Sequence, residues 1–149
     1  MKKRISINRQ DPAAYTAMNA LDTYVKSTPI DPVHKEIIRI RASQINGCAF
    51  CVNLHTKDAR KLGVSEQRVY LTAAWREAGE VFSEEERLLL KMTEEITLIH
   101  QQGLTEETYD RAIATFGEQK TAQIIMVIIT INAWNRIGVS TESRPLVDK

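Results

Sequence analysis

Apolar residues in this chain recur at steps of three and four, the spacing that places side chains on one face of a helix. The clearest stripe lies in residues 84–101 and consists of Leu89, Met92, Ile96 and Ile99. No segment gives a convincing strand pattern, so the sequence predicts an all-α fold. Helices are expected at residues 11–27, 32–45, 48–62, 66–78, 84–101, 106–116 and 118–137.

Residues that favour helix ends separate these segments. Side chains that cap helix N-termini are Asp31, Ser65, Ser83 and Thr105. Ser83 also has Glu86 three residues later, which is the spacing of a capping box. Glycine in the left-handed conformation often ends a helix. The glycines expected to do so are Gly63, Gly103, Gly117 and Gly138.

The expected helix at residues 118–137 is apolar on nearly every side. It contains an apolar run from Ile124 to Ile129, and Ile131, Ala133 and Trp134 follow. Neighbours must cover most of such a helix. A small domain does not easily enclose it, which favours self-association into a homo-oligomer.

Composition and charge narrow the class of protein. The chain has 149 residues, of which 43% are hydrophobic and 26% charged, as in globular proteins. No linker or internal repeat interrupts it, so we interpret residues 1–149 as a single domain. A net charge of +1 provides no field that attracts nucleic acid or anionic lipid. The longest apolar run is too short to span a membrane.

Two further features favour a cytoplasmic protein. The basic N-terminus, Met1 to Arg4, is not followed by the apolar stretch of a signal peptide. The sequence has only two cysteines, Cys48 and Cys51, whereas extracellular disulfide scaffolds carry more cysteines at wider spacing.

The candidate chemistry lies in residues 34–63. Cys48 and Cys51 form a C-x-x-C motif, and His55 follows the second cysteine by four residues. On a helix these three side chains share one face, so the sulfurs are close enough to form a disulfide and the imidazole can accept a thiol proton. This stripe is suited to redox chemistry.

Glu36 is expected to orient His55. A turn at Asn46-Gly47 would make residues 32–45 and 48–62 a helical hairpin. At about 1.5 Å per residue, Glu36 lies roughly 15 Å before the turn and His55 roughly 12 Å after it, so antiparallel packing brings them to similar heights. A carboxylate on one ring nitrogen fixes the tautomer and makes the other nitrogen a stronger base.

The residues themselves leave open which sulfur attacks first. Both cysteines lie in the expected first turn of a helix, where backbone N–H groups and the helix dipole favour a thiolate. Cys48 has the better position for the dipole, and Cys51 is nearer the base.

This segment resembles the core motif of the alkylhydroperoxidase D (AhpD)-like proteins of the carboxymuconolactone decarboxylase superfamily. In that motif a glutamate precedes the C-x-x-C by twelve residues and a histidine follows its second cysteine by four. The residues that match are Glu36, Cys48, Cys51 and His55. Residues 41–47, 73–78 and 82–97 are also similar, and the resemblance covers a core of about residues 20–135.

The resemblance implies a fold, an activity and partners. It implies an AhpD-like bundle of about six or seven helices with the C-x-x-C on a helical hairpin, assembled as trimers or hexamers. It implies a thiol peroxidase in which the Cys51 thiol, deprotonated through His55 and Glu36, attacks a peroxide. Cys48 would then resolve the sulfenic acid as a disulfide. A lipoylated or thioredoxin-like protein would reduce this disulfide, and no cofactor or metal is implied.

One position departs from the family pattern. The best-known peroxidases of the family have a histidine immediately before the second cysteine, and this chain has Phe50 there. The superfamily's decarboxylases lack the dithiol, which argues against lactone chemistry for this chain.

Other interpretations remain open. In one alternative, the protein is a non-catalytic helical assembly module and its cysteines are structural thiols. In another, the protein is a thiol–disulfide oxidoreductase that acts on a different substrate, such as an electrophilic organic compound. A zinc site would combine Cys48, Cys51 and His55 with His34 or Glu36. We otherwise interpret His34 as a surface group at a helix start and His100 as a cation near a helix C-terminus. The aromatic residues expected in the core or an interface are Tyr70, Trp75, Phe82 and Trp134.

Overall fold

The computed structural model describes residues 4–147, and every regular element in that range is helical. The α-helices are α1 (Ile7–Gln10), α2 (Pro12–Ser27), α3 (Pro32–Ile45), α4 (Ala49–Lys61), α5 (Glu66–Leu71), α6 (Glu84–Thr97) and α7 (Glu106–Ser140). Two 3₁₀ helices, η1 (Thr72–Glu77) and η2 (Gly79–Val81), lie between α5 and α6. The all-α prediction is confirmed.

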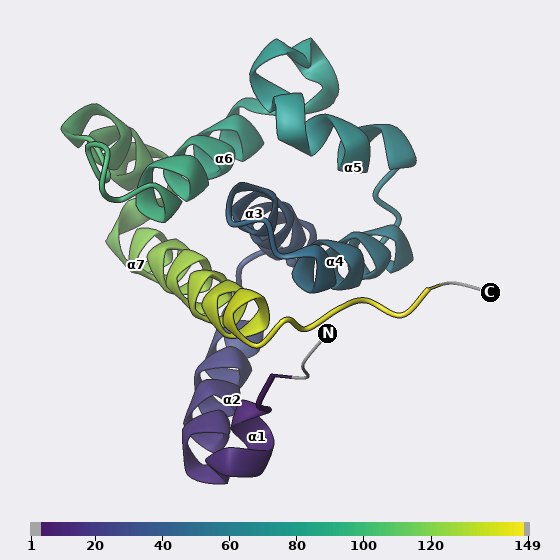
Figure 1. Cartoon of the computed structure of the whole chain (residues 1–149). Coiled ribbons are helices and arrows are strands. Elements are labelled where there is room, and N and C mark those ends of the chain that lie inside the picture. The colour runs from purple at the N-terminus through teal and green to yellow at the C-terminus, as the bar shows by residue number, and fades with distance from the viewer. Residues whose placement is uncertain (1–3, 148–149) are drawn as a thin grey trace.

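Helix α3 is the centre of the structure. It packs against α4, α6 and α7, whereas α1 and α2 stand away from the α5–α6 side of the bundle (Figure 1). Its Ile38 joins a core with residues of α6 and α7, and its Ile37 packs with Trp75, Phe82 and Leu90. The apolar faces of these helices therefore meet around α3.

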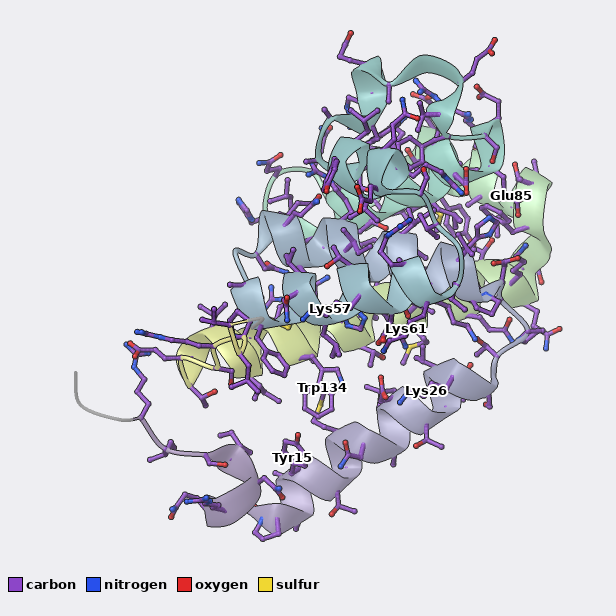
Figure 2. All side chains as sticks on the ribbon, turned by 90° about the vertical axis from the view of Figure 1, so that its right-hand side faces the viewer. Tyr15, Lys26, Lys57, Lys61, Glu85 and Trp134 are labelled. Carbon is purple, nitrogen blue, oxygen red and sulfur yellow. A yellow bond between two sulfur atoms is a disulfide. The ribbon has the colours of Figure 1, made fainter. Side chains whose placement is uncertain are left out.

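Contacts at both ends help to hold α2 in place. Tyr15 of α2 meets Trp134 of α7 edge to face, with ring centroids 5.3 Å apart (Figure 2). At the other end of α2, Lys35 of α3 donates from Nζ to the carbonyl oxygens of Lys26 and Thr28, at 3.1 and 2.8 Å. Burial, followed by the charge of Arg39, lowers the pKa of the Lys35 amine below its usual value.

The predicted N-caps are present. Asp31 accepts from Val33 N, and Ser65 and Thr105 each accept from the backbone N–H three residues later. Ser83 and Glu86 form the reciprocal capping box. These bonds satisfy backbone donors that the helices leave unpaired.

Two predicted helices are shorter than expected. The segment 66–78 is helical only to Leu71 and continues as 3₁₀ turns, with Ala74 outside helical geometry. The segment 84–101 ends at Thr97. Glu95 accepts hydrogen bonds from Thr105 N and Thr108 Oγ1. These bonds hold the start of α7 against α6, so the chain must turn before residue 101.

Of the two glycines in the last helix, one behaves as predicted and the other does not. Gly117 has φ 76° and interrupts helical geometry as predicted, since a side chain there would be strained. Gly138 does not end a helix, because α7 continues to Ser140. The rest of α7 packs on α3 and α6, but Ile129 and Val139 are exposed.

By length and composition, α7 is apolar enough to cross a membrane, and 44% of its most apolar window is buried within the structure. This is weak evidence for a span, because core helices pass the same test. The absence of a membrane span remains a prediction.

The aromatic residues divide between core and surface. Trp75 and Phe82 are buried, and Trp134 packs beside the cysteines. Tyr70 is 68% exposed and does not lie in the core, so its place in an interface stays a prediction. His34 is also not the surface group expected, because its ring is largely buried with Nε2 4.0 Å from Glu86 Oε1.

Candidate functional site

The C-x-x-C lies at the turn of a helical hairpin made by α3 and α4. Asn46 in this turn donates from Nδ2 to the side-chain oxygens of Asn132 and Asn135, both at 2.9 Å. Asn135, which is fully buried, donates in turn to Ser43 Oγ at 2.9 Å. Because buried amides need partners, this network fixes the turn to α7.

The two cysteines begin α4. Cys48 is its N-cap and accepts through Sγ from Cys51 N at 3.4 Å. The structure joins the pair in a disulfide, with the Cα atoms 5.4 Å apart. The residues are 2% and 5% exposed, and they pack with Ala42 and Ile131. The disulfide expected from the i, i+3 spacing is thus sterically feasible in this fold.

Glu36 and His55 meet across the hairpin, as the register of the two helices predicts. Glu36 Oε2 lies 2.8 Å from His55 Nδ1, and Glu36 is 6% exposed. We assign the proton to Nδ1, because an ionised carboxylate only accepts hydrogen bonds. His55 Nε2 is then the basic nitrogen.

Arg39 completes the surroundings of Glu36. Its Nη1 donates to Glu36 Oε1 at 2.7 Å, and its Nη2 lies 3.7 Å from Asp22 Oδ1 on α2. Both oxygens of Glu36 therefore have a positive or donor partner. Arg39 thus holds the carboxylate by one oxygen while the other faces His55.

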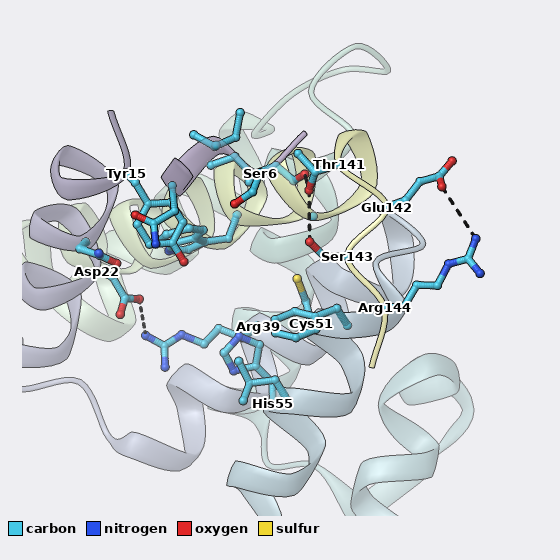
Figure 3. A pocket seen from close by; sticks show the side chains of 18 of the residues that line it. Ser6, Tyr15, Asp22, Arg39, Cys51, His55, Thr141, Glu142, Ser143 and Arg144 are labelled. Atoms are coloured by element: carbon cyan, nitrogen blue, oxygen red, sulfur yellow. Dashed lines mark hydrogen bonds and ion pairs between the residues drawn. The ribbon is translucent and has the colours of Figure 1, made fainter. Parts of the chain in front are cut away.

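A cavity of about 850 Å³ opens beside these groups (Figure 3). Cys51 and His55 line it, and Cys48 does not. The terminal segments form part of the wall, where Arg4 donates to the carbonyl oxygen of Ser140 at 2.8 Å and pairs with Glu142 at 2.9 Å. Of the two cysteines, Cys51 therefore lies on the wall of the cavity.

The structure brings the predicted site residues together as two pairs, Glu36 with His55 and Cys48 with Cys51, and one member of each pair lines the cavity. His34 does not join Cys48, Cys51 and His55 in the predicted zinc site, because its ring lies beside Glu86.

Three groups at this site were not predicted from the sequence. Arg39 and Asp58 each follow a predicted site residue by three positions, a helical spacing that signals a contact. Gly138 has no such signal. A Cβ atom at Gly138 would lie 3.0 Å from Cys48 Sγ, so the absence of a side chain makes room for the dithiol.

The helical fold and the dithiol hairpin define an AhpD-like protein. The sequence profile of the carboxymuconolactone decarboxylase family matches residues 12–95, and the chain belongs to this family. The chain is 38% identical over 144 residues to "Uncharacterized protein YdfG" of Bacillus subtilis (strain 168), covering 97% of each chain.

Solved structures give the same fold. A crystal structure from Agrobacterium tumefaciens, of a protein of unknown function whose description names the antioxidant defence protein AhpD, superposes with a TM-score of 0.94. It is 38% identical and covers 99% of this chain and 100% of that one. An alkylhydroperoxidase AhpD core from Ralstonia eutropha JMP134 has a TM-score of 0.81 over 93% of this chain and 74% of its own. At 17% identity it supports the fold alone.

Proposed function

We propose that this protein is a thiol-dependent peroxidase in which Cys51 is the attacking sulfur. The observation that carries the proposal is that Cys51 and His55 line one cavity while His55 holds Glu36 at 2.8 Å. The Agrobacterium tumefaciens structure, whose name refers to antioxidant defence, supports a role in peroxide removal but not the choice of sulfur. The position of Cys51 on the cavity wall favours it over Cys48, a choice that spacing left open.

The proposed relay begins with the thiol proton. His55 Nε2 takes the proton of Cys51, and the ionised Glu36 stabilises the imidazolium that forms. The thiolate attacks the terminal oxygen of a hydroperoxide ROOH, so a sulfur–oxygen bond forms and the oxygen–oxygen bond breaks. The leaving alkoxide takes the proton from His55 and departs as ROH, which leaves Cys51 as a sulfenic acid.

Cys48 closes the cycle. Its sulfur attacks the sulfenic sulfur of Cys51, forming the disulfide and releasing one water. An external dithiol then returns both residues to thiols and is itself oxidised. We propose a lipoylated or thioredoxin-like protein as this reductant, which places the enzyme in a reducing cytoplasm.

We also propose a homo-oligomer, a trimer or hexamer, built from single-domain chains. The exposed apolar residues of α7, among them Ile129 and Val139, support association because isolated chains rarely leave such a helix face uncovered. Sedimentation velocity of the full chain tests this, and a monomer at all concentrations would contradict it.

A single-turnover experiment tests the activity. Reduced protein is mixed with one equivalent of cumene hydroperoxide, and peroxide loss and remaining thiols are counted. We expect one peroxide consumed and two thiols lost per chain. Cys51→Ser should consume none, and Cys48→Ser should stop at a sulfenic acid that dimedone traps.

Two outcomes would reject the proposal. Unchanged peroxide with both thiols intact would favour a structural role for the cysteines or a different electrophilic substrate. Peroxide loss that survives Cys51→Ser but not Cys48→Ser would reverse the roles of the two sulfurs.

A further inference from the structure

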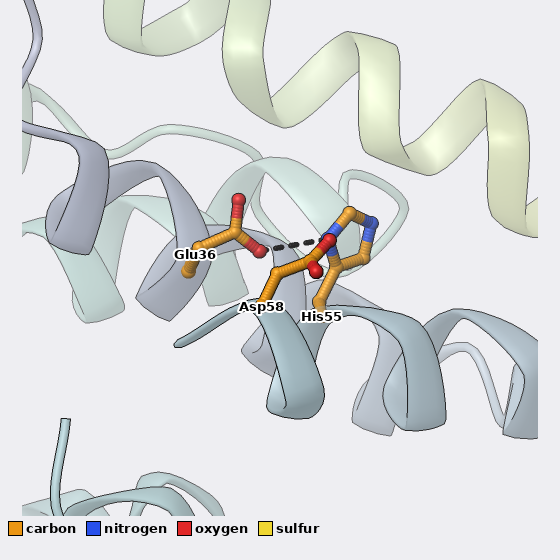
Figure 4. Close-up of side chains that lie close together, drawn as sticks. All are labelled: Glu36, His55 and Asp58. Atoms are coloured by element: carbon orange, nitrogen blue, oxygen red, sulfur yellow. Dashed lines mark hydrogen bonds and ion pairs between the residues drawn. The ribbon is translucent and has the colours of Figure 1, made fainter. Parts of the chain in front are cut away.

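Three side chains with metal-binding atoms converge beside the dithiol. Glu36 comes from α3, whereas His55 and Asp58 lie three residues apart on one face of α4 (Figure 4). One ligand atom from each lies within 4.8 Å of the other two. Glu36 is buried, whereas His55 and Asp58 also line the cavity, so an ion can reach the group from solvent.

We propose that Glu36, His55 and Asp58 form a binding site for a divalent transition-metal ion, with zinc the best fit. One imidazole nitrogen and two carboxylate oxygens are zinc ligands, and three protein ligands leave a fourth position for water or another molecule. A ligand set without sulfur requires no free thiol. The site therefore forms while Cys48 and Cys51 are joined as a disulfide.

The ligand atoms must shift to fit a tetrahedral ion, since they lie within 4.8 Å of one another. Ligand atoms about 2.05 Å from a tetrahedral zinc ion lie roughly 3.3 Å from one another. Glu36 Oε2 and His55 Nδ1 are 2.8 Å apart, so they would separate by about half an ångström. The ion would take the place of the proton that now lies between them.

Charge at the site also permits a cation. Arg39 donates a hydrogen bond to Glu36 Oε1, and Lys61 donates one to Asp58 Oδ1 at 2.7 Å. The second oxygen of each carboxylate is therefore left for the ion. Asp22 adds a third negative charge near Arg39. The Lys61 amine is on a 75% exposed side chain, so solvent weakens its repulsion.

Metal binding would compete with the proposed relay. His55 bound through Nδ1 to zinc loses its hydrogen bond to Glu36, and the imidazolium that the peroxidase cycle needs cannot form. Zinc would therefore inhibit peroxide turnover reversibly. This consequence rests on the proposed function, but the binding itself does not.

The test uses the oxidised protein, because free thiols would bind zinc independently. Isothermal titration with Zn²⁺ should give one site per chain, and Asp58→Asn should weaken it by about tenfold or more. Glu142→Gln is the matched control, since Glu142 lines the same cavity and its side chain is 35% exposed against 37% for Asp58. The Glu142→Gln protein should bind Zn²⁺ with the affinity of the wild type.

A second probe identifies the ligands. Co²⁺ bound to the oxidised protein should give visible d–d bands without a thiolate-to-metal charge-transfer band, and Asp58→Asn should alter them. Failure of the wild type to bind either ion would overturn the site, as would Asp58→Asn binding with unchanged affinity.

Peroxide assays separate this inference from the proposed function. Stoichiometric zinc binding by a protein that does not consume peroxide would support the site and reject the peroxidase. Peroxide consumption by a protein that does not bind zinc would support the peroxidase and reject the site.

Discussion

Gly138 of α7 lies directly against the sulfur of Cys48. A Cβ atom at this position would stand 3.0 Å from Cys48 Sγ and 3.8 Å from Cys51 Sγ. The first distance is shorter than a normal van der Waals contact, so α7 approaches the dithiol as closely as it does only because residue 138 is glycine. The glycine that sequence analysis interpreted as a helix end has a packing role.

Gly138→Ala should therefore shift the thiol–disulfide equilibrium toward the dithiol. The added methyl group collides with Cys48 Sγ in the disulfide, whereas a reduced Cys48 side chain is free to rotate away. Overpacking of this kind costs about 1–3 kcal/mol, so we expect a shift of about tenfold. Equilibration with oxidised and reduced dithiothreitol measures it.

Val139→Ala is the control for this variant. Val139 follows Gly138 on the same helix but is exposed, so its truncation should leave the equilibrium unchanged. A Gly138→Ala protein with the wild-type equilibrium would show that the helix moves to accommodate the methyl group.

Glu36→Gln should reduce the reactivity of the Cys51 thiol. Glutamine keeps the size of the side chain and can still accept from Arg39, but it removes the negative charge beside His55 Nδ1. The imidazolium loses its stabilising partner, and we expect peroxide consumption to fall by about 100-fold. Ultraviolet titration of the thiolate in a Cys48→Ser background should show a smaller thiolate fraction at neutral pH.

Glu94→Gln separates this effect from simple loss of a buried carboxylate. Glu94 of α6 accepts from Arg41 and Trp75, and its side chain is 13% exposed against 8% for Glu36. It should lose stability without changing the thiolate titration. Equal titration curves for Glu36→Gln and the wild type would contradict the relay.

The contact between Glu36 and His55 could be predicted because both residues lie on helices joined by one short turn. Counting the rise per residue from Asn46-Gly47 gives their relative heights. The packing of Gly138 against Cys48 could not be predicted this way. It joins residues 90 positions apart, and it depends on how α7 crosses the hairpin.

The segment after α5 shows a second limit of sequence reasoning. Residues 73–78 have good helix formers, yet Ala74 leaves helical geometry and the turns become 3₁₀. Trp75 there packs on Ile37 and Leu90 and donates from Nε1 to Glu94 at 2.7 Å. Burial of one large side chain thus overrides local helix propensity.

Asn135→Ala should destabilise the protein and loosen the dithiol turn. Asn135 is fully buried, accepts from Asn46 and donates to Ser43. Its truncation leaves both partners short of a hydrogen bond and creates a cavity, for which we expect a loss of about 2–4 kcal/mol in the free energy of unfolding. Urea denaturation measures this loss.

Thr130→Val is the matched control for the network. Thr130 is also buried on α7, but its hydroxyl donates to Met126 O within the same helix. It should cost less stability and leave the rate of peroxide consumption unchanged. A similar loss of stability in both variants would argue against a special role for the Asn135 network.

Phe50→His should increase the rate with hydrogen peroxide and lower it with bulky aromatic hydroperoxides. Phe50 precedes Cys51, is 41% exposed and forms part of the cavity wall. Histidine there adds a proton donor for the leaving oxygen and removes an apolar surface that favours aromatic substrates. Leu54→His is the control, because Leu54 is 42% exposed on the same wall and follows Phe50 by one helical turn. We expect the ratio of kcat/KM for hydrogen peroxide over cumene hydroperoxide to rise about tenfold in Phe50→His and much less in Leu54→His. Equal ratios in the two variants would mean that the wall selects by polarity alone and that the position next to Cys51 has no particular part in proton transfer.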